Sequence, residues 1–317
     1  MIEPERIERI RAVVLCWNNA ALIDRCLEHV LGTDWPGRLD VVVVDNGSTD
    51  GSVDRWEERH PGVALIQTGT NLGYAAGVNR GLADLADVDA VALVNSDAFV
   101  EPGWLRPLAT ALDTDEDIGA ASPKIVFADP GRTGAVRINN VGSELGEDWV
   151  PRDRGFGEVD VGQYDHEEDV WGWCGAAVLL RRRYLEEVGC FDERLFMYAE
   201  DAELSWRGAR RGWRYRYVPS SVVRHEHRGS SGGERTPRLD YLNRRNRLVV
   251  VTRHAGLRGA VTAWARVLGG IVAGVGTELV VPVLHGRRPD AARWRRRVRA
   301  AVDAVRLLSG GHPALPY

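Results

Sequence analysis

Lysine is almost absent from this sequence: Lys124 is the only one among 317 residues, so arginine supplies nearly all of the positive charge. Cysteine is scarce as well, and the chain has four, at Cys16, Cys26, Cys174 and Cys190. They show no Cys-X-X-Cys spacing and lie in apolar surroundings. This pattern favours buried, reduced thiols over a disulfide framework or a zinc site.

Several sequence signals are also missing. The first six residues contain no apolar stretch of the kind found in secretory signals, so we expect the protein to act in the cytoplasm. Neither the GxGxxG pattern of dinucleotide-binding proteins nor the GxxxxGK(S/T) pattern of P-loop proteins occurs. Their absence argues against both of these nucleotide-binding classes.

The first hundred residues alternate between short apolar runs and helical patterns. Four of the runs are typical of buried strands: 12–16, 39–44, 63–66 and 91–94. Such alternation predicts a parallel, doubly wound α/β sheet. From 119 to 169 the periodicity weakens, and there we expect antiparallel edge strands and loops.

Polar side chains follow two of these strands directly. The strand at 91–94 leads into Asn95 and Asp97, and the strand at 39–44 leads into a loop that begins at Asp45 and is rich in glycine and acids. Open α/β sheets bind ligands beyond the carboxyl ends of their strands, which makes these residues candidates for ligand binding. A simple turn-capping role is the alternative for Asp97.

Other motifs each allow a structural and a functional interpretation. Small residues over 71–81 let a helix N-terminus approach a diphosphate closely. Trp171 and Trp173 could pack in the core or stack on a sugar. The adjacent Glu200 and Asp201 either cap a helix or perform chemistry.

Two histidines, His225 and His227, close the α/β part of the chain, at the end of a predicted strand. With one residue between them, they could be metal ligands or ordinary surface histidines, and their spacing alone does not decide between the two.

The C-terminal region leaves the α/β pattern. From Tyr241 to the end it holds fourteen arginines and three acidic residues, so it is a basic module on an acidic body. Residues 257–284 are apolar but interrupted by charges, which favours helices packed on the preceding domain or on another subunit of a homodimer over a membrane span. The alternative is peripheral membrane contact through 257–299. The acidic body and the lack of a reading motif argue against nucleic-acid binding.

The order and spacing of these motifs resemble the family 2 nucleotide-sugar glycosyltransferases, especially their rhamnosyltransferase-like bacterial branch. The resemblance covers about 12–247 and rests on these motifs: 44–50, 71–79, 95–97, 175–177, 200–201, and His225 with the Gly-Ser loop after it. It implies a GT-A fold over 1–238, with a nucleotide-binding half at about 1–118 and an acceptor-side half at about 119–238. A basic helical region at 239–317 would follow.

The resemblance also implies roles for single residues. Donor binding would fall to Asn18, Asp45, Asn71, Gly77, Asn79, Asn95 and Asp97. Asp97 matches the last acid of the family's DxD motif and would hold Mg²⁺ or Mn²⁺ on the donor diphosphate, with His225 completing the coordination. Asn95 stands where an acid is more usual, so we expect weaker metal affinity. Asp201, or else Glu200, would be the general base, and Trp171 and Trp173 would face the acceptor.

The implied reaction is inverting transfer of a sugar from a nucleotide diphosphate, with a dTDP-deoxysugar such as dTDP-rhamnose as the favoured donor. The acceptor would be a hydroxyl of a cell-envelope glycan, a lipid-linked glycan or a secondary metabolite. Two alternatives stay open: a catalytically inactive partner protein on the same scaffold, and a nucleotidyltransferase of similar sheet architecture.

Overall fold

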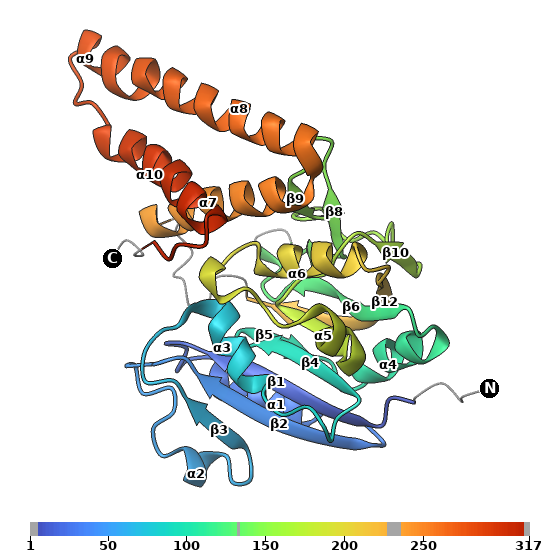
Figure 1. The fold of residues 1–317 in the computed structure, drawn as a ribbon. Helices are drawn as coiled ribbons and strands as arrows, with labels where there is room; N and C mark the ends of the chain where they lie inside the picture. The colour runs from blue at the N-terminus through green and yellow to red at the C-terminus, as the bar shows by residue number, and fades with distance from the viewer. Residues whose placement is uncertain (1–5, 132–133, 227–235, 314–317) are drawn as a thin grey trace. The chain divides into compact units, whose positions relative to one another are not determined.

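A computed structural model of the chain describes residues 6–131, 134–226 and 236–313 (Figure 1). The chain forms two compact units. The first comprises 1–144, 152–193 and 201–233, and the second comprises 145–151, 194–200 and 234–317. Their descriptions follow separately.

The first unit is built on a ten-stranded sheet, in which eight strands follow the order β10-β12-β6-β11-β4-β1-β2-β3 and two short strands, β5 and β7, pair beside this path. The four predicted strands are present as β1 (Arg9–Cys16), β2 (Arg38–Asp45), β3 (Ala64–Gln67) and β4 (Ala90–Asn95). They are parallel to one another, because β1 pairs with both β2 and β4, and β2 pairs with β3. The expected α/β fold with a mostly parallel sheet is therefore confirmed.

The remaining strands extend this sheet beyond β4. Antiparallel pairing joins β11 (Ala177–Arg181) to β4 and to β6 (Ile118–Phe127), and β6 runs parallel to β12 (Arg214–His225). The short strands β10 (Glu168–Val170) and β5 (Ala98–Val100) pair with β12, and β7 (Ile138–Asn140) pairs with β6. A separate ribbon joins β8 (Ser143–Leu145) and β9 (Pro151–Asp153).

The expectation of edge strands over 119–169 was wrong for β6. This strand lies inside the sheet between β11 and β12, and nine of its ten residues are buried. Its sequence, with Gly119, Pro123 and Lys124, gives little period-two signal because both faces are covered. Buried Lys124 is accommodated by ion pairs with Asp160 and Asp165.

Helices cover both faces of the sheet. Alternate residues of β1 point to opposite sides: Val14 belongs to a core cluster with α1 (Ile23–Leu31) and α4 (Leu105–Thr114), whereas Val13 belongs to a cluster with α3 (Gly73–Gly81) and α5 (Arg182–Val188). The other helical segments of this unit are α2 (Trp56–Arg59) and α6, which begins at Glu200 and ends at Ala209. A short turn of 3₁₀ helix, Glu193–Leu195, precedes α6.

All four cysteines are free, as the sequence predicts. Cys16 and Cys26 are buried, and burial raises the pKa of the Cys16 thiol to about 11. The prediction of burial was wrong for Cys190, which is exposed, because it lies in the turn after α5 rather than in a core element.

The second unit is helical and contains α7 (Pro237–His254), α8 (Gly256–Gly274), α9 (Val281–Leu284) and α10 (Ala291–Leu308). A π-helical turn, Val275–Val280, joins α8 to α9. Tyr241 of α7 donates a hydrogen bond to the buried Asp303 of α10 over 2.7 Å, which ties the first and last helices of the unit together. The Thr236 side chain caps α7, and Asp290 caps α10.

Gly256–Leu284 forms a continuous 29-residue helical stretch that is apolar enough and long enough to cross a membrane. Its most apolar 18-residue window has a mean hydropathy of 2.0, and 11% of that window is buried. Length and composition alone are weak evidence for a span, because core helices of soluble proteins can meet the same criteria.

Candidate active site

Three neighbouring strands bring the predicted donor residues to one edge of the sheet. The register pairs Cys16 at the end of β1 with Asp45 at the end of β2, and Leu15 with Asn95 at the end of β4. The loops that follow these strands therefore emerge side by side. This is the ligand-binding edge of an open α/β sheet.

Hydrogen bonds lock the loops after β1 and β2 together. Asp45 is buried, and its Oδ1 accepts from the backbone N–H of Ser48 over 3.0 Å. Ser48 Oγ in turn accepts from the backbone N–H of Asn18 over 3.0 Å, and Asn18 Oδ1 accepts from Thr49 over 2.7 Å. Asn18 has a φ of 47°, a left-handed conformation that asparagine tolerates. The structure thus brings Asn18 and Asp45 into one network.

Asn46 is a residue of this edge that the sequence reasoning missed. Its Oδ1 accepts from Leu72 N–H over 3.0 Å, and its Nδ2 donates to the carbonyl of Gly73 over 3.0 Å and to Asn71 Oδ1 over 3.3 Å. It therefore fixes the start of α3 against the loop after β2. An asparagine directly after a buried strand was the available signal.

Gly77 on α3 allows this close approach. A Cβ atom there would lie 2.6 Å from Leu15 Cδ1 and 3.2 Å from Asn46 Nδ2.

Asn79, also on α3, contacts a different segment. Its Nδ2 donates to the carbonyl of Phe191, and its Oδ1 accepts from Phe191 N–H. The amide of Asn79 thus ties α3 to the segment after α5, and a donor-binding role for it stays a prediction.

Asp97 and His225 form a buried polar pair at the same edge. His225 Nε2 lies 3.1 Å from Asp97 Oδ1, and His225 Nδ1 lies 3.0 Å from Asn139 Oδ1. Because an amide oxygen only accepts, Nδ1 carries a hydrogen and donates to Asn139. Nε2 then faces Asp97 Oδ1, and a divalent cation placed there would bind both atoms.

The donor set therefore fits a metal that completes its shell with ligand oxygens. Within the described residues, no group of three or more His, Cys, Asp or Glu side chains could hold a metal by itself. Asp97 and His225 would supply one oxygen and one nitrogen, and a donor diphosphate would supply further oxygens. His227 and the Gly-Ser loop after it lie outside the described residues.

The predicted base, Asp201, lies in the first turn of α6. Its Oδ2 accepts from the backbone N–H of Gly175 over 3.2 Å, and its Oδ1 accepts from Ala202 N–H over 2.7 Å. Burial, and next the negative charge of Asp153, raise its pKa from 3.8 to about 6. Asp153 is itself held by Asn140, whose Nδ2 donates to it over 2.8 Å. A carboxylate with such a pKa can accept a proton near neutral pH.

Comparison with known proteins identifies the class. Residues 12–189 match the model of Glycosyl transferase family 2. The chain belongs to glycosyl transferase family 2. This glycosyltransferase is 32% identical over 251 residues to N-acetylglucosaminyl-diphospho-decaprenol L-rhamnosyltransferase of Mycobacterium tuberculosis, covering 74% of this chain and 81% of that relative. It is 29% identical over 294 residues to Pre-mycofactocin glycosyltransferase of the same organism, covering 88% and 57%.

Solved structures support the GT-A fold of this glycosyltransferase. The mannosyltransferase PcManGT from Pyrobaculum calidifontis, in complex with GDP-Man and Mn²⁺, superposes with a TM-score of 0.54 at 21% identity, over 96% of this chain and 88% of that one. GalNAc-T7 with UDP, GalNAc and Mn²⁺ superposes with a TM-score of 0.60 at 15% identity, over 78% and 48%. At such low identities the likeness concerns the fold.

A strained loop precedes α6 in this glycosyltransferase, and sequence reasoning did not find what supports it. Three residues without glycine's freedom have positive φ, between 62° and 73°: Phe196, Tyr198 and Ala199. Asn246 of α7 is fully buried, and the two hydrogens of its Nδ2 are shared among three carbonyls of the loop, at 2.8–2.9 Å: Leu195, Met197 and Tyr198. The neighbouring Arg245 donates to the Leu195 carbonyl over 2.9 Å. These contacts fix the backbone that leads into Glu200, which is buried, and then into Asp201.

The two candidate acceptor-side tryptophans differ in exposure. Trp173 is fully buried and packs edge-on against Phe191, with ring centroids 6.0 Å apart, which favours the core-packing interpretation. Trp171 is half-buried and packs edge-on against Trp206 at 5.2 Å. Trp171 therefore remains the candidate of the two with accessible ring surface.

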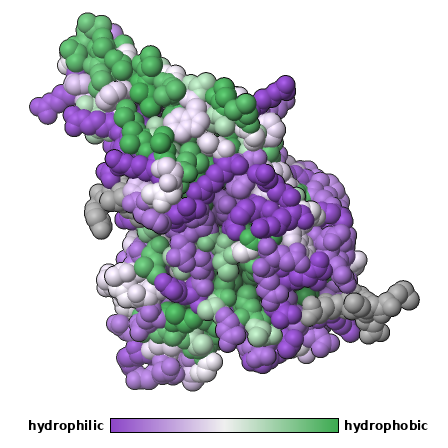
Figure 2. Space-filling model, in the orientation of Figure 1, coloured by the Kyte–Doolittle hydropathy of each residue, from purple (hydrophilic) through white to green (hydrophobic). Residues whose placement is uncertain are grey.

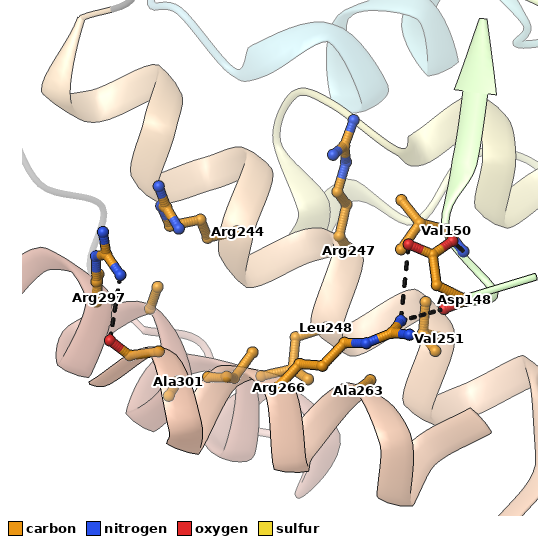
Figure 3. A pocket seen from close by; sticks show the side chains of 13 residues that line it. Asp148, Val150, Arg244, Arg247, Leu248, Val251, Ala263, Arg266, Arg297 and Ala301 are labelled. Atoms are coloured by element: carbon orange, nitrogen blue, oxygen red, sulfur yellow. Dashed lines mark hydrogen bonds and ion pairs between the residues drawn. The ribbon is translucent and has the colours of Figure 1, made fainter. Parts of the chain in front are cut away.

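A cavity of about 290 Å³ lies within the helical unit (Figure 3). Apolar residues such as Leu248 and Val251 line it together with arginines from three helices. Figure 3 shows Arg266 reaching towards Asp148, and the two charged groups are 3.7 Å apart. Arg297 is bound to Glu278 over 2.7 Å. Arg266 and Arg297 therefore already have acidic partners, and these ion pairs beside the cavity help to hold the unit together.

Proposed function

We propose that this glycosyltransferase moves a deoxysugar, with rhamnose from dTDP-rhamnose favoured, to a hydroxyl of a lipid-linked cell-envelope glycan, with inversion at the transferred carbon. The supporting observation is the 32% identity to an L-rhamnosyltransferase over 74% of this chain. The family match over 12–189 includes Asp45 and Asp97. A small-molecule acceptor is the second candidate, because the chain also resembles the Pre-mycofactocin glycosyltransferase.

In the proposed mechanism Asp201 is the general base. Inverting transfer requires a carboxylate that takes the proton of the acceptor hydroxyl while its oxygen attacks C1 opposite the leaving nucleoside diphosphate. The backbone N–H groups of Gly175 and Ala202 hold the carboxylate of Asp201 in a fixed orientation. Its raised pKa makes it a stronger proton acceptor than an exposed aspartate.

Donor binding would use the opposite side of the reaction centre. Asp45, Asn18 and Asn71 would contact the nucleotide from the loops after β1, β2 and β3. Asp97 and His225 would hold Mg²⁺ or Mn²⁺, which stabilises the negative charge that develops on the leaving diphosphate. Asn95 would contribute a hydrogen bond in place of a second carboxylate. Its neutral side chain is the reason that we expect metal affinity below that of a two-acid site.

The proposed place of the reaction is the cytoplasm, where nucleotide-activated sugars would be supplied. Calorimetric titration of dTDP, UDP and GDP into the purified protein, each with Mn²⁺ and with EDTA, tests the donor assignment. We expect selective, metal-dependent binding of dTDP.

Transfer from dTDP-rhamnose to N-acetylglucosaminyl-diphospho-lipid, with the anomeric configuration of the product read by NMR, tests the acceptor and the inversion. Metal-independent binding, or a product that retains the donor's configuration, would contradict the proposal.

A further inference from the structure

The helical unit exposes an unusual amount of apolar surface along α8 and α9. Large apolar side chains on α8 and the turn after it recur at helical spacing and remain 41–81% exposed: Leu257, Val261, Leu268, Val272 and Val275. Four more are 45–76% exposed around α9: Val280, Val281, Val283 and Leu284. Figure 2 shows this hydrophobic surface gathered over α8 and α9. We call these nine residues the apolar stripe.

The single acidic residue between 256 and 289 does not reach this surface. Glu278 is 7% exposed, and its Oε1 binds two arginines of α10, Arg293 at 3.2 Å and Arg297 at 2.7 Å. It lies in the π-helical turn, which departs from the regular helix at this residue. The carboxylate of Glu278, which interrupts the apolar sequence, is therefore buried inside the helical unit and does not lie on the apolar stripe.

Positive charge adjoins the stripe at both of its ends. Arg258 follows Leu257 directly and is exposed, and exposed Arg287 and Arg288 follow Leu284 within four residues. An apolar surface bounded by arginines, with its only acid buried, is complementary to the apolar and anionic layers of a membrane surface.

The other face of α8 packs inside its own unit. Trp264 Nε1 donates to Thr252 of α7 over 3.1 Å, and Trp294 Nε1 of α10 donates to the Ile271 carbonyl over 3.0 Å. Arg297 adds a bond to the Gly270 carbonyl over 3.2 Å. Crossing a bilayer would carry these charged neighbours into the hydrocarbon, which is costly. One-sided exposure instead suits a helix that lies along the surface.

We propose that the apolar stripe, with Arg258, Arg287 and Arg288, docks the helical unit on an anionic phospholipid surface. The occupant is the bilayer itself: the stripe enters the acyl boundary, and the arginines contact lipid phosphates. This inference goes beyond sugar transfer, and its main test, vesicle flotation, needs neither donor nor acceptor. It would place the enzyme at the inner face of the membrane.

Flotation of the full-length protein with vesicles tests the docking. We expect it to float with vesicles of equal parts phosphatidylcholine and phosphatidylglycerol, to float poorly with phosphatidylcholine alone, and to be released by high salt at alkaline pH. Leu268→Glu with Val272→Glu should weaken binding by roughly tenfold or more, since two charges would enter the apolar layer. Arg287→Gln with Arg288→Gln should weaken it by roughly tenfold, as removal of two phosphate contacts predicts.

Matched controls separate docking from general effects. Leu31→Glu with Val161→Glu changes apolar side chains that are 52% and 79% exposed in the other unit, and should leave flotation unchanged. Transfer to a water-soluble acceptor analogue should also be unchanged in the stripe variant. A docking failure is thus distinguishable from a failure of the proposed reaction.

Several results would overturn the inference. One is that the wild-type protein stays at the bottom of the gradient with anionic vesicles. Another is that the bound protein resists alkaline extraction, which would indicate a spanning helix. A dimer in light scattering that Leu268→Glu with Val272→Glu dissociates would show instead that a second copy covers the stripe. Loss of flotation in the Leu31 and Val161 control would show that the effect is not specific to this surface.

Discussion

The imidazole of His225 meets the carboxylate of Asp97 at 3.1 Å although 128 positions separate them in the chain. The register of β12 on β5 explains the meeting, because it sets His225 opposite Ala98, the residue after Asp97. Both side chains are buried, and Asn139 orients the ring from its far side. The geometry therefore presents one oxygen and one nitrogen in a fixed arrangement before any ligand arrives.

Removing the charge of Asp97 should weaken metal-dependent nucleotide binding. For Asp97→Asn we expect an affinity loss of about 10–100-fold for the preferred nucleoside diphosphate in Mn²⁺, of the size seen when groups that hold a metal are changed. In EDTA the variant and the wild type should bind alike. Calorimetry measures both. Equal binding of the two proteins in Mn²⁺ would contradict the metal assignment.

Asp201→Asn should abolish turnover and spare donor binding. The amide keeps the shape of the carboxylate but cannot take the acceptor proton, so we expect a rate loss of about 10²–10⁴-fold. The affinity for the nucleoside diphosphate should change little. Glu187→Gln, which removes an exposed carboxylate paired with Arg183, is the control and should retain full activity. Weakened nucleotide binding with residual rate in Asp201→Asn would reassign the residue to the donor side.

The rate should rise with pH through about 6, because the base works only when ionised and its pKa is raised to about 6. Asp153→Asn removes the second cause of that shift and should move the acidic limb to lower pH, while burial, the larger cause, remains. A pH profile of kcat/KM for both proteins checks this. Asp40→Asn is the control, since it changes an aspartate in the exposed ion pair with Arg38. If the acidic limb of the kcat/KM profile is unchanged in Asp153→Asn, then Asp153 does not contribute to the raised pKa of Asp201.

The same pKa shift has a consequence for stability. Because the pKa of Asp201 in the folded protein lies above its ordinary value of 3.8, protonation favours the folded state. This contribution is fully present below about pH 3.8 and is lost as the pH rises through about 6. At neutral pH, Asp201→Asn should therefore raise the melting temperature. Thermal unfolding of the variant and the wild type at pH 5 and at pH 8 measures this, and the increase in melting temperature should be larger at pH 8. A lower melting temperature in the variant at pH 8 would contradict it.

Asn246→Ala should damage both stability and rate. The substitution removes the buried amide donor of the Met197 and Tyr198 carbonyls, whereas the Leu195 carbonyl keeps its bond from Arg245. This loss costs about 2–4 kcal/mol in the free energy of unfolding. The strained backbone before Glu200 should relax, and kcat should fall more than the affinity for the donor. Thermal unfolding and steady-state kinetics measure these effects. Asn243→Ala on the same helix is the matched control, and equal losses in both variants would show that only helix stability had changed.

Much of the donor side could be predicted from the sequence. The apolar composition of the runs that form β1, β2 and β4 indicates that they are buried. Asp45 is the last residue of β2, and Asp97 lies in the turn directly after β4. Strand direction then places these residues on one edge, because parallel strands share it. Asn46 directly follows Asp45 in the same loop, so the same signal marks it.

Composition alone predicts the basic and apolar character of the C-terminal region, but not which of its side chains face outward. An apolar run with one glutamate has no unique interpretation, because burial of Glu278 depends on Arg293 and Arg297 from a helix that follows. Likewise β6 lacks a period-two pattern because both of its faces are covered, so its place inside the sheet came only from pairing.

By itself, then, the sequence determined the α/β order, the donor-side motifs and the basic, apolar tail, because these depend on composition and local spacing. Only the tertiary structure gave the 3.1 Å contact between His225 and Asp97, which the family resemblance had implied as shared metal coordination. It alone showed that burial and Asp153 raise the pKa of Asp201, and that Asn246 supports the loop before α6. Each of these joins residues far apart in the chain, and such contacts follow from strand register and helix packing, which no local pattern encodes.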